Sequence, residues 1–171
     1  KAVDSSLAFT LKDQTGKEVR LSDFAGKIVV LEWLNPECPF VQAHYKAGTM
    51  VGLAKKYADK GVVWLGVNST KTATAASNKV FVDDYSLPYP ILDDHEGTVG
   101  RLFGAKTTPH LFVLDTKGQI AYQGAIDNSP MGKTESGVDK VNYVDQAVAE
   151  LLKDAPVTVV KTDPYGCSVK Y

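Results

Sequence analysis

The two cysteines are the residues of this 171-residue chain best suited to chemistry. Cys38 follows an apolar, β-branched stretch at residues 28–34 and directly precedes Pro39, a residue favoured in a first helical turn. This pattern predicts a strand, a turn and a helix, with Cys38 at the helix N-terminus. Unpaired N–H groups and the helix dipole there stabilise a thiolate and lower the thiol pKa. We therefore interpret Cys38 as a reactive thiol; the alternative is a buried structural cysteine.

The second cysteine, Cys167, lies 129 positions downstream in the segment Tyr165-Gly166-Cys167-Ser168. Attack by Cys38 on a disulfide or a peroxide leaves a mixed disulfide or a sulfenic acid, which a second thiol must clear. Cys167 is the one other thiol in the chain, so we expect it to be the resolving or disulfide partner of Cys38. The alternatives are that Cys167 bonds to another molecule or staples the tail.

Glu32 is a charged residue within the apolar stretch, three residues before Asn35. A carboxyl group buried there would have a raised pKa and could move protons during thiol exchange. Alternatively, Glu32 lies at a polar edge of the sheet and pairs with a lysine. The histidines and cysteines repeat no known metal-ligand spacing, and no haem, flavin, nucleotide or phosphate-loop motif is present. We therefore expect no metal and no cofactor.

The elements that must position these residues predict an α/β fold. Strand and helix patterns alternate along the chain, which implies a layered structure with parallel strands at its centre. A polar turn at residues 12–17 joins two short strand patterns into an N-terminal hairpin. Apolar strands at residues 28–34 and 62–67 are typical of a sheet buried on both faces. Further helices are expected at residues 70–86, 98–103 and 141–153, and further strands at residues 91–92, 111–114 and 119–123.

Composition and charge argue against several classes of protein. The net charge is −1 and only two arginines are present, which argues against nucleic-acid binding. Hydrophobic residues make up 44% of the chain, as in ordinary globular domains. No apolar run approaches the roughly 18 residues that a membrane-spanning helix needs. Two cysteines are also too few for a disulfide-stapled scaffold or a four-ligand zinc site.

Three segments carry a resemblance to a known family. The segment EWLNPECPFV, with LSDFAGK before it, resembles the thioredoxin-like superfamily, and most closely its redoxin branch, the alkyl hydroperoxide reductase and thiol-specific antioxidant (peroxiredoxin-like) family. The segments GAKTTPHLFVLDTKGQIAYQG and PYGCSVKY match further along. The resemblance implies a thioredoxin-like three-layer α/β/α fold with a central mixed sheet, an N-terminal β-hairpin and an extended C-terminal tail. It also implies a cis bond between Thr108 and Pro109, which would present the Thr108 backbone toward Cys38 as an edge for an extended thiol substrate.

The chain departs from both branches that it resembles. Asn35 replaces the first cysteine of the thioredoxin Cys-x-x-Cys motif, and Cys38 occupies the position of the peroxidatic cysteine of peroxiredoxins. The amide of Asn35 could hydrogen-bond a thiolate or a peroxide oxygen. Leu31 and Pro109 stand where the peroxiredoxin signature has a proline and an arginine. The resemblance therefore implies a thiol-dependent oxidoreductase or antioxidant protein, and leaves open whether it reduces peroxide or exchanges disulfides.

We expect one redoxin domain at residues 1–155 and a tail at residues 156–171 that carries Cys167. The alternative to an enzyme is a non-catalytic binding or accessory protein in which a Cys38–Cys167 disulfide is structural. The expected partner is a thiol or disulfide, in a protein or a small molecule, or a peroxide; the sequence does not indicate the oligomeric state. The start at Lys1 and the resemblance to exported redoxins favour a bacterial periplasmic or extracellular location and leave a cytoplasmic one open.

Overall fold

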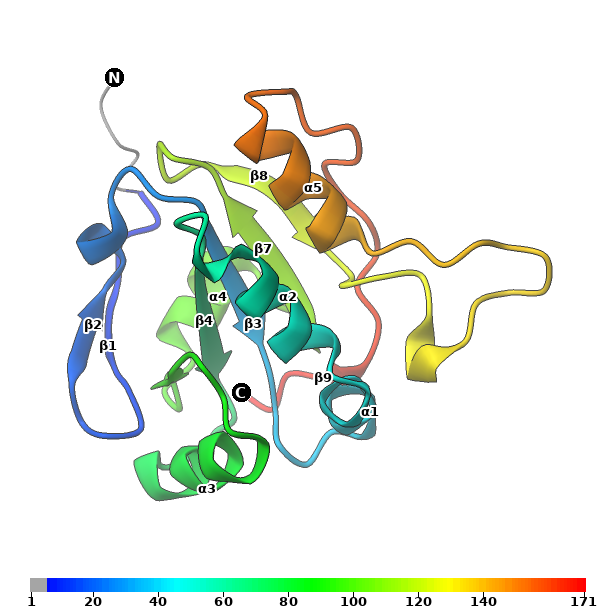
Figure 1. The fold of residues 1–171 in the computed structure, drawn as a ribbon. Helices are drawn as coiled ribbons and strands as arrows, with labels where there is room; N and C mark the ends of the chain where they lie inside the picture. The colour runs from blue at the N-terminus through cyan, green and yellow to red at the C-terminus, as the bar shows by residue number, and fades with distance from the viewer. Residues whose placement is uncertain (1–5) are drawn as a thin grey trace.

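A mixed β-sheet forms the centre of the computed structural model, which describes residues 6–171 (Figure 1). The seven strands are β1 (Thr10–Lys12), β2 (Glu18–Arg20), β3 (Val29–Trp33), β4 (Val63–Asn68), β5 (Ile91–Asp93), β7 (His110–Leu114) and β8 (Ile120–Gly124). The central strands β3, β4 and β7 have five or six residues and are almost wholly buried, as the apolar sequence patterns predict.

The strand order is β2-β1-β5-β4-β3-β7-β8. Strands β3, β4 and β5 run parallel, whereas β7 pairs antiparallel with β3 so that His110 lies opposite Trp33. The N-terminal hairpin joins β5 only through Lys12 opposite Asp93. All five residues of β3 are buried, because this strand has a neighbour on each side and packed layers on both faces.

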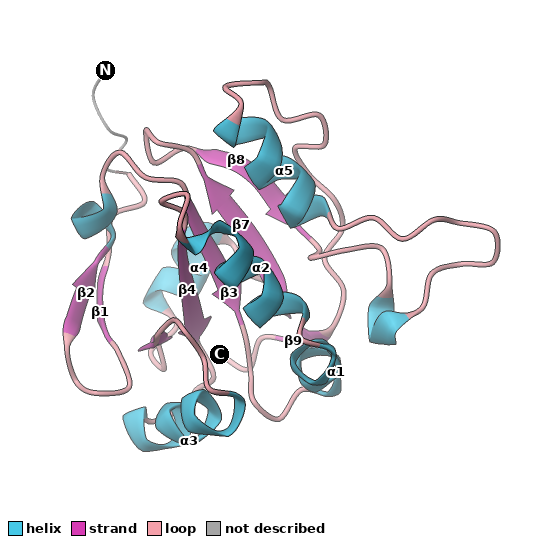
Figure 2. Cartoon of the chain, in the orientation of Figure 1, coloured by secondary structure: helices cyan, strands magenta, loops and turns pink. Residues whose placement is uncertain are grey.

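Helices cover both faces of the sheet, so the three-layer α/β/α arrangement is confirmed (Figure 2). Val30 and Leu34 of β3 pack in the core on one face, and Leu31 and Trp33 pack in the core on the other. The first face is covered by α1 (Pro39–Ala47), α2 (Thr49–Ala58), α3 (Ala75–Tyr85) and α5 (Tyr143–Leu152), the second by α4 (Thr98–Phe103); short 3-10 turns lie at η1 (Leu21–Phe24) and η2 (Pro130–Gly132).

Helix α3 begins later than the sequence pattern predicts. The expected helix starts at residue 70, but α3 starts at Ala75 because Thr74 is its N-cap. The Thr74 hydroxyl accepts a hydrogen bond from the Ser77 amide at 3.0 Å, and the Ser77 hydroxyl bonds back to Thr74. Residues 70–74 are therefore turn residues that lead into the helix.

The C-terminal tail, residues 156–171, folds back across the domain. The Gln123 amide donates to the Val160 carbonyl and the Thr162 amide donates to the Gln123 carbonyl, each at 3.1 Å, so the tail first runs beside β8. Strand β9 (Cys167–Ser168) then pairs antiparallel with β6 (Thr107–Thr108). In Figure 1 this red segment passes α1 and ends near the far end of β4. The tail thereby returns Cys167 to the region of Cys38.

Candidate active site

Cys38 lies at the junction between the sheet and α1, where the sequence places it. It is the N-cap residue of α1, and its amide donates to the Asn35 carbonyl at 2.9 Å. Its side chain is only 2% exposed. The Cys38 Sγ donates to the carbonyl oxygen of Thr108 at 3.2 Å. The thiol is therefore held between a helix N-terminus and the Thr108 backbone.

The bond between Thr108 and Pro109 is cis, as the family resemblance implies. The Thr108 backbone faces Cys38 on one side and pairs with Cys167 on the other. The Thr108 hydroxyl is buried and has no oxygen or nitrogen partner among residues 6–171. This hydroxyl is therefore available to donate to a thiolate at Cys38.

Cys167 lies opposite Thr108 in the β6–β9 pairing, and both cysteines are free thiols. Burial and, after it, the interaction with the Cys38 thiol together raise the pKa of the Cys167 thiol to about 11. Cys167 therefore keeps its proton near neutral pH and can donate it toward Cys38. In this pair the Cys167 thiol is the hydrogen-bond donor and the Cys38 thiolate is the acceptor.

The pKa of Cys38 is lowered despite burial. Burial disfavours the thiolate, but hydrogen bonds from the Cys167 thiol, the Val41 N–H and the Thr108 side chain outweigh it. The Val41 N–H is one of the amides left unpaired at the start of α1, as expected at a helix N-terminus. The arrangement therefore favours the nucleophilic form of Cys38.

Gly166 allows the tail to approach this closely. Its φ is +130°, and a Cβ atom added there would lie 2.1 Å from the Thr108 carbonyl oxygen and 3.1 Å from Pro109 Cδ. Contacts of 2.1 Å do not occur between such atoms, so a side chain at position 166 would push the tail away. The glycine before Cys167 is thus required by the packing of the tail onto the cis bond.

Asn35, the other residue expected to contact the thiolate, shapes the turn before Cys38. Its side-chain oxygen accepts from the Glu37 amide at 3.0 Å, while its carbonyl accepts from the Cys38 amide. No hydrogen bond joins the Asn35 side chain to either cysteine in the described part of the chain. The hydrogen bond from Asn35 to a thiolate or a peroxide oxygen remains a prediction.

Glu32 is fully buried in β3, not at a polar edge of the sheet paired with a lysine. Its carboxylate accepts hydrogen bonds from the Tyr45 hydroxyl at 2.8 Å and from the Trp64 indole at 3.0 Å, with the Tyr89 hydroxyl at 3.4 Å. Burial raises the pKa of Glu32 to about 7, although these hydrogen bonds oppose the shift. Glu32 can therefore change its protonation state near neutral pH.

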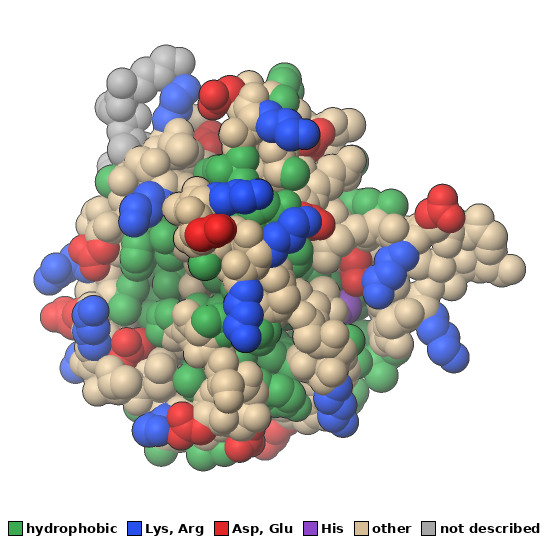
Figure 3. Space-filling model, viewed as in Figure 1, with side chains coloured by type: hydrophobic (Ala, Val, Ile, Leu, Met, Phe, Trp, Pro, Cys, Tyr) green, Lys and Arg blue, Asp and Glu red, His purple; other side chains and the backbone are tan. Residues whose placement is uncertain are grey.

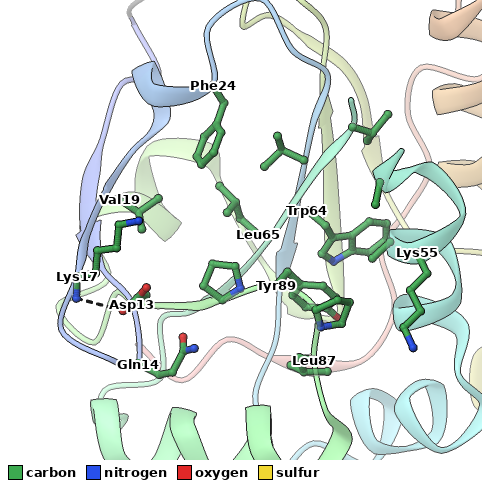
Figure 4. Close-up of a pocket in the computed structure, with 16 residues that line it drawn as sticks. Asp13, Gln14, Lys17, Val19, Phe24, Lys55, Trp64, Leu65, Leu87 and Tyr89 are labelled. Carbon is green, nitrogen blue, oxygen red and sulfur yellow. Dashed lines mark hydrogen bonds between the residues drawn. The ribbon is translucent and has the colours of Figure 1, made fainter. Parts of the chain in front are cut away.

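A surface cavity of about 610 Å³ reaches the residues that hold Glu32. Figure 4 shows Trp64 and Tyr89 on its wall, between the hairpin that carries Asp13 and the helix that carries Lys55. The cavity brings solvent to side chains that contact Glu32. Neither cysteine lines it, so the cavity is separate from the thiol site.

Three residues that the sequence did not single out as a group hold the tail near Cys167. Tyr165, on the tail, contacts His44 of α1 and Asp127 of the loop at residues 125–142. His44 and Asp127 are buried, at 3% and 1% exposure. The one signal in the sequence was an aromatic residue two positions before Cys167, which does not identify its partners.

The remaining surface carries no second candidate of comparable chemistry. Within residues 6–171 no three His, Cys, Asp or Glu side chains are placed to bind a metal ion. The helices of this same part of the chain are too short or too polar to cross a bilayer. On the face shown in Figure 3, basic and acidic side chains are interspersed.

Comparison with known sequences finds thiol redox proteins among the relatives of this chain. Residues 3–123 match the model of the AhpC/TSA family. The chain is 36% identical over 121 residues to the chloroplastic peroxiredoxin Q of Triticum aestivum, covering 67% of this chain and 54% of that protein. It is 30% identical over 119 residues to the thiol-disulfide oxidoreductase ResA of Bacillus thuringiensis subsp. konkukian, covering 66% and 62%. The chain thus spans little more than half the length of these curated relatives.

Solved structures confirm the thioredoxin-like fold that the sequence predicts. An uncharacterized conserved protein from Geobacillus kaustophilus superposes with a TM-score of 0.85 at 26% identity, covering 100% of this chain and 92% of that one. A secreted disulfide oxidoreductase of Mycobacterium tuberculosis has a TM-score of 0.66 at 23% identity, covering 87% and 100%. The first of these similarities includes the tail that carries Cys167.

The buried carboxyl group predicts a specific pH dependence of stability. Glu32 titrates near 4.5 when exposed by unfolding and near 7 when folded, so the folded state binds its proton more tightly. Stability should therefore fall as pH rises through this range, by about 3 kcal/mol in total. The Glu32→Gln variant should lack this component. Urea unfolding of both proteins from pH 4.5 to 8 measures it.

The exposed residue Glu37, in the turn before Cys38, supplies the matched control. Glu37→Gln should follow the pH dependence of the unchanged protein. Parallel stability curves for the unchanged protein and Glu32→Gln would show that Glu32 does not titrate as the structure indicates.

Proposed function

The chain belongs to the AhpC/TSA family, and we propose that it is a thiol-disulfide oxidoreductase in which Cys38 is the nucleophile and Cys167 the resolving thiol. One observation carries the proposal: β9 pairs with β6 so that Cys167 lies opposite Thr108, whose carbonyl contacts the Cys38 thiol. A nucleophile and its resolving group are thereby held on two sides of one peptide unit. The pKa of Cys38 is lowered and that of Cys167 is raised, so Cys38 ionises first and is the first to attack.

The proposed reaction consumes one disulfide and oxidises the two protein thiols. The Cys38 thiolate attacks one sulfur of the substrate disulfide, so a Cys38–substrate bond forms and the other substrate half leaves as a thiolate. Cys167 then loses its proton and attacks the Cys38 sulfur. The Cys38–Cys167 disulfide forms and the second substrate half leaves as a thiolate. An external dithiol must return the pair to the reduced state.

Reduction of peroxide is the second candidate, favoured by the 36% identity to peroxiredoxin Q. In that reaction the Cys38 thiolate takes one peroxide oxygen and becomes a sulfenic acid, and the alcohol leaves after taking a proton. Cys167 then attacks the sulfenic sulfur, and water leaves as the disulfide forms. Disulfide exchange is preferred because the peroxiredoxin signature includes an arginine that is missing from this site. Arg101 stacks on Tyr171 at 4.6 Å and Arg20 lies in β2, so neither arginine contacts Cys38.

We assign Glu32 a supporting role in proton movement. Its hydrogen bond to Tyr45 links it to α1, the helix that Cys38 begins. A carboxyl group with a pKa of about 7 can accept and return a proton at neutral pH. Thr108 and Pro109 are assigned to positioning, because the Thr108 carbonyl accepts from the Cys38 thiol and Thr108 pairs with Cys167.

The proposed partners are thiols or disulfides in proteins or small molecules. The Thr107–Thr108 edge already holds one extended cysteine segment, namely the tail. An exported location, in a periplasm or outside the cell, fits this chemistry, since disulfides persist there. The relative from Triticum aestivum is named a chloroplastic protein.

The resolving role predicts that Cys167→Ser separates attack from turnover. The variant should still react once with a small disulfide such as oxidised glutathione and keep the glutathione half on Cys38. Multiple turnover with an external reductant should fall roughly 100-fold, because an external thiol then replaces a neighbouring one. Mass spectrometry of the trapped adduct and steady-state rates measure the two effects.

Cys38→Ser is the control and should lose both the adduct and the turnover. Unchanged turnover in Cys167→Ser would remove the resolving role of Cys167. Rapid loss of thiols with hydrogen peroxide, together with slow loss with oxidised glutathione, would select the peroxidase function instead.

The close approach at Gly166 gives an independent prediction. Gly166→Ala should displace the tail, because the new Cβ would meet the Thr108 carbonyl oxygen. Formation of the Cys38–Cys167 disulfide should slow at least about tenfold, since a loosely tethered thiol has a lower effective concentration. Stopped-flow oxidation with a small disulfide measures the rate.

Gly137→Ala is the matched control. Gly137 also has a positive φ, of +78°, but a Cβ there would have no atom within 4 Å. It should carry the backbone strain of the substitution without displacing the tail. Equal rates for the Gly166 and Gly137 variants would show that disulfide formation does not need the docked tail.

A further inference from the structure

Resting on the resolving role proposed for Cys167, we propose that Tyr165 is a positioning residue for thiol exchange. Its hydroxyl, held between His44 and Asp127, sets the place of Cys167 beside Cys38. We call these three residues the tail latch. His44, Asp127 and Tyr165 lie far apart in the sequence, and no motif or regular spacing relates them.

The hydrogen bonds of the tail latch form one consistent chain. The Tyr165 hydroxyl donates to Asp127 Oδ1 at 2.5 Å and lies 2.6 Å from His44 Nε2. Because a hydroxyl has one proton, His44 must donate from Nε2 to the Tyr165 oxygen. His44 Nδ1 then accepts from the Thr49 hydroxyl at 3.2 Å. Each ring nitrogen of His44 therefore has a partner when the imidazole is neutral.

Burial makes this arrangement costly to break. His44 is 3% exposed and Asp127 is 1% exposed, so water reaches neither freely. Burial lowers the pKa of His44, which favours the neutral form that this hydrogen-bond chain requires. Removal of the Tyr165 hydroxyl would leave His44 Nε2 without a hydrogen-bond partner, because Asp127 Oδ1 lies 4.0 Å away. Asp127 Oδ1 would keep only the hydrogen bond from the Ser129 amide. Because an unpaired buried polar group is unfavourable, the hydrogen-bonded state of the tail latch is favoured over the broken one.

The tail latch fixes the tail relative to the helix that carries the nucleophile. Cys38 is the N-cap of α1, and His44 lies on the same helix. Phe40, also on α1, packs against the Tyr165 ring with a centroid separation of 5.9 Å. Tyr165 precedes Cys167 by two residues, with only Gly166 between them. Because Tyr165 is attached to α1, Cys167 is held close to Cys38 at the N-terminus of the same helix.

The pairing of β9 with β6 alone holds the tail less firmly than that pairing and the tail latch together. Strand β9 has two residues, and its register rests on Cys167 and Ser168 opposite Thr108 and Thr107. A two-residue pairing at the molecular surface opens more readily than a longer ladder. The tail latch supplies the side-chain contacts that keep this short strand in place on the side of the tail that leads into Cys167.

Tyr165→Phe tests the proposal because it removes one oxygen and keeps the ring that packs on Phe40. In the reduced variant the tail should leave Cys38 more often, so alkylation of Cys38 by iodoacetamide should accelerate about 10-fold. The equilibrium constant for the Cys38–Cys167 disulfide against a glutathione buffer should fall about 10- to 100-fold, the range for loss of a hydrogen bond to a buried charged group. A residue that only stabilises the fold would change the unfolding midpoint and leave both values unaltered.

Tyr143→Phe is the matched control. Tyr143 lies on α5, and its hydroxyl has no hydrogen-bond partner in the described residues. Both measured values should stay as in the unchanged protein. Asp127→Asn is the second variant, because its amide oxygen can still accept from Tyr165; it should weaken the disulfide less than Tyr165→Phe does.

The outcomes separate this proposal from the one on which it rests. If the unchanged protein forms no Cys38–Cys167 disulfide in any glutathione buffer, the resolving role of Cys167 fails. If that disulfide forms, but Tyr165→Phe forms it with the same equilibrium constant and shows the same alkylation rate, the tail latch is refuted. A weaker disulfide and a more accessible Cys38 in Tyr165→Phe, with Tyr143→Phe unchanged, support it.

Discussion

The carbonyl group of Thr108 is the point on which the rest of the site depends. It accepts a hydrogen bond from the Cys38 thiol at 3.2 Å, and its residue pairs with Cys167 on the other side. A Cβ atom added at Gly166 of the tail would meet the same oxygen. The strands of the sheet hold this peptide unit rigidly, since β7 begins at His110 and pairs along its length with β3. Thr108 thus brings together Cys38, from the first quarter of the chain, and Cys167, from the tail.

Two buried acids in this molecule show how local donors decide the outcome of burial. Glu32 has three hydrogen-bond donors from side chains, yet burial still raises its pKa to about 7. Cys38 is also buried, but its pKa is lowered. The difference lies in the helix N-terminus, where the Val41 N–H is left free to bind the thiolate, and in the Cys167 thiol beside it. The fold therefore holds a carboxyl group that stays protonated to near neutrality and a thiol that ionises more readily, both next to the same helix.

The sequence predicts local features of the site well because adjacent residues determine them. The apolar stretch before Cys38 and the proline after it were sufficient to place the thiol at a helix N-terminus. The cis bond between Thr108 and Pro109 was expected only from the family resemblance, because most X-Pro bonds are trans. Contacts between distant segments were not predictable in this way. His44 and Tyr165 are 121 positions apart, and Tyr165 and Asp127 are 38 apart. No periodicity relates such positions, so only the folded chain identifies them as partners.

The same distance along the chain has a consequence for how the protein is made. Cys38 and Cys167 are 129 residues apart, and translation adds about 5–20 residues each second, so roughly 6–26 s pass between the synthesis of the two thiols. In that interval the nascent chain carries Cys38 without the thiol that we propose as its resolving group. An adduct that an oxidant or a disulfide formed on Cys38 in this time would persist until residues 156–171 are made and dock. Under the proposed function, docking of residues 156–171 therefore both completes the site and clears such an adduct.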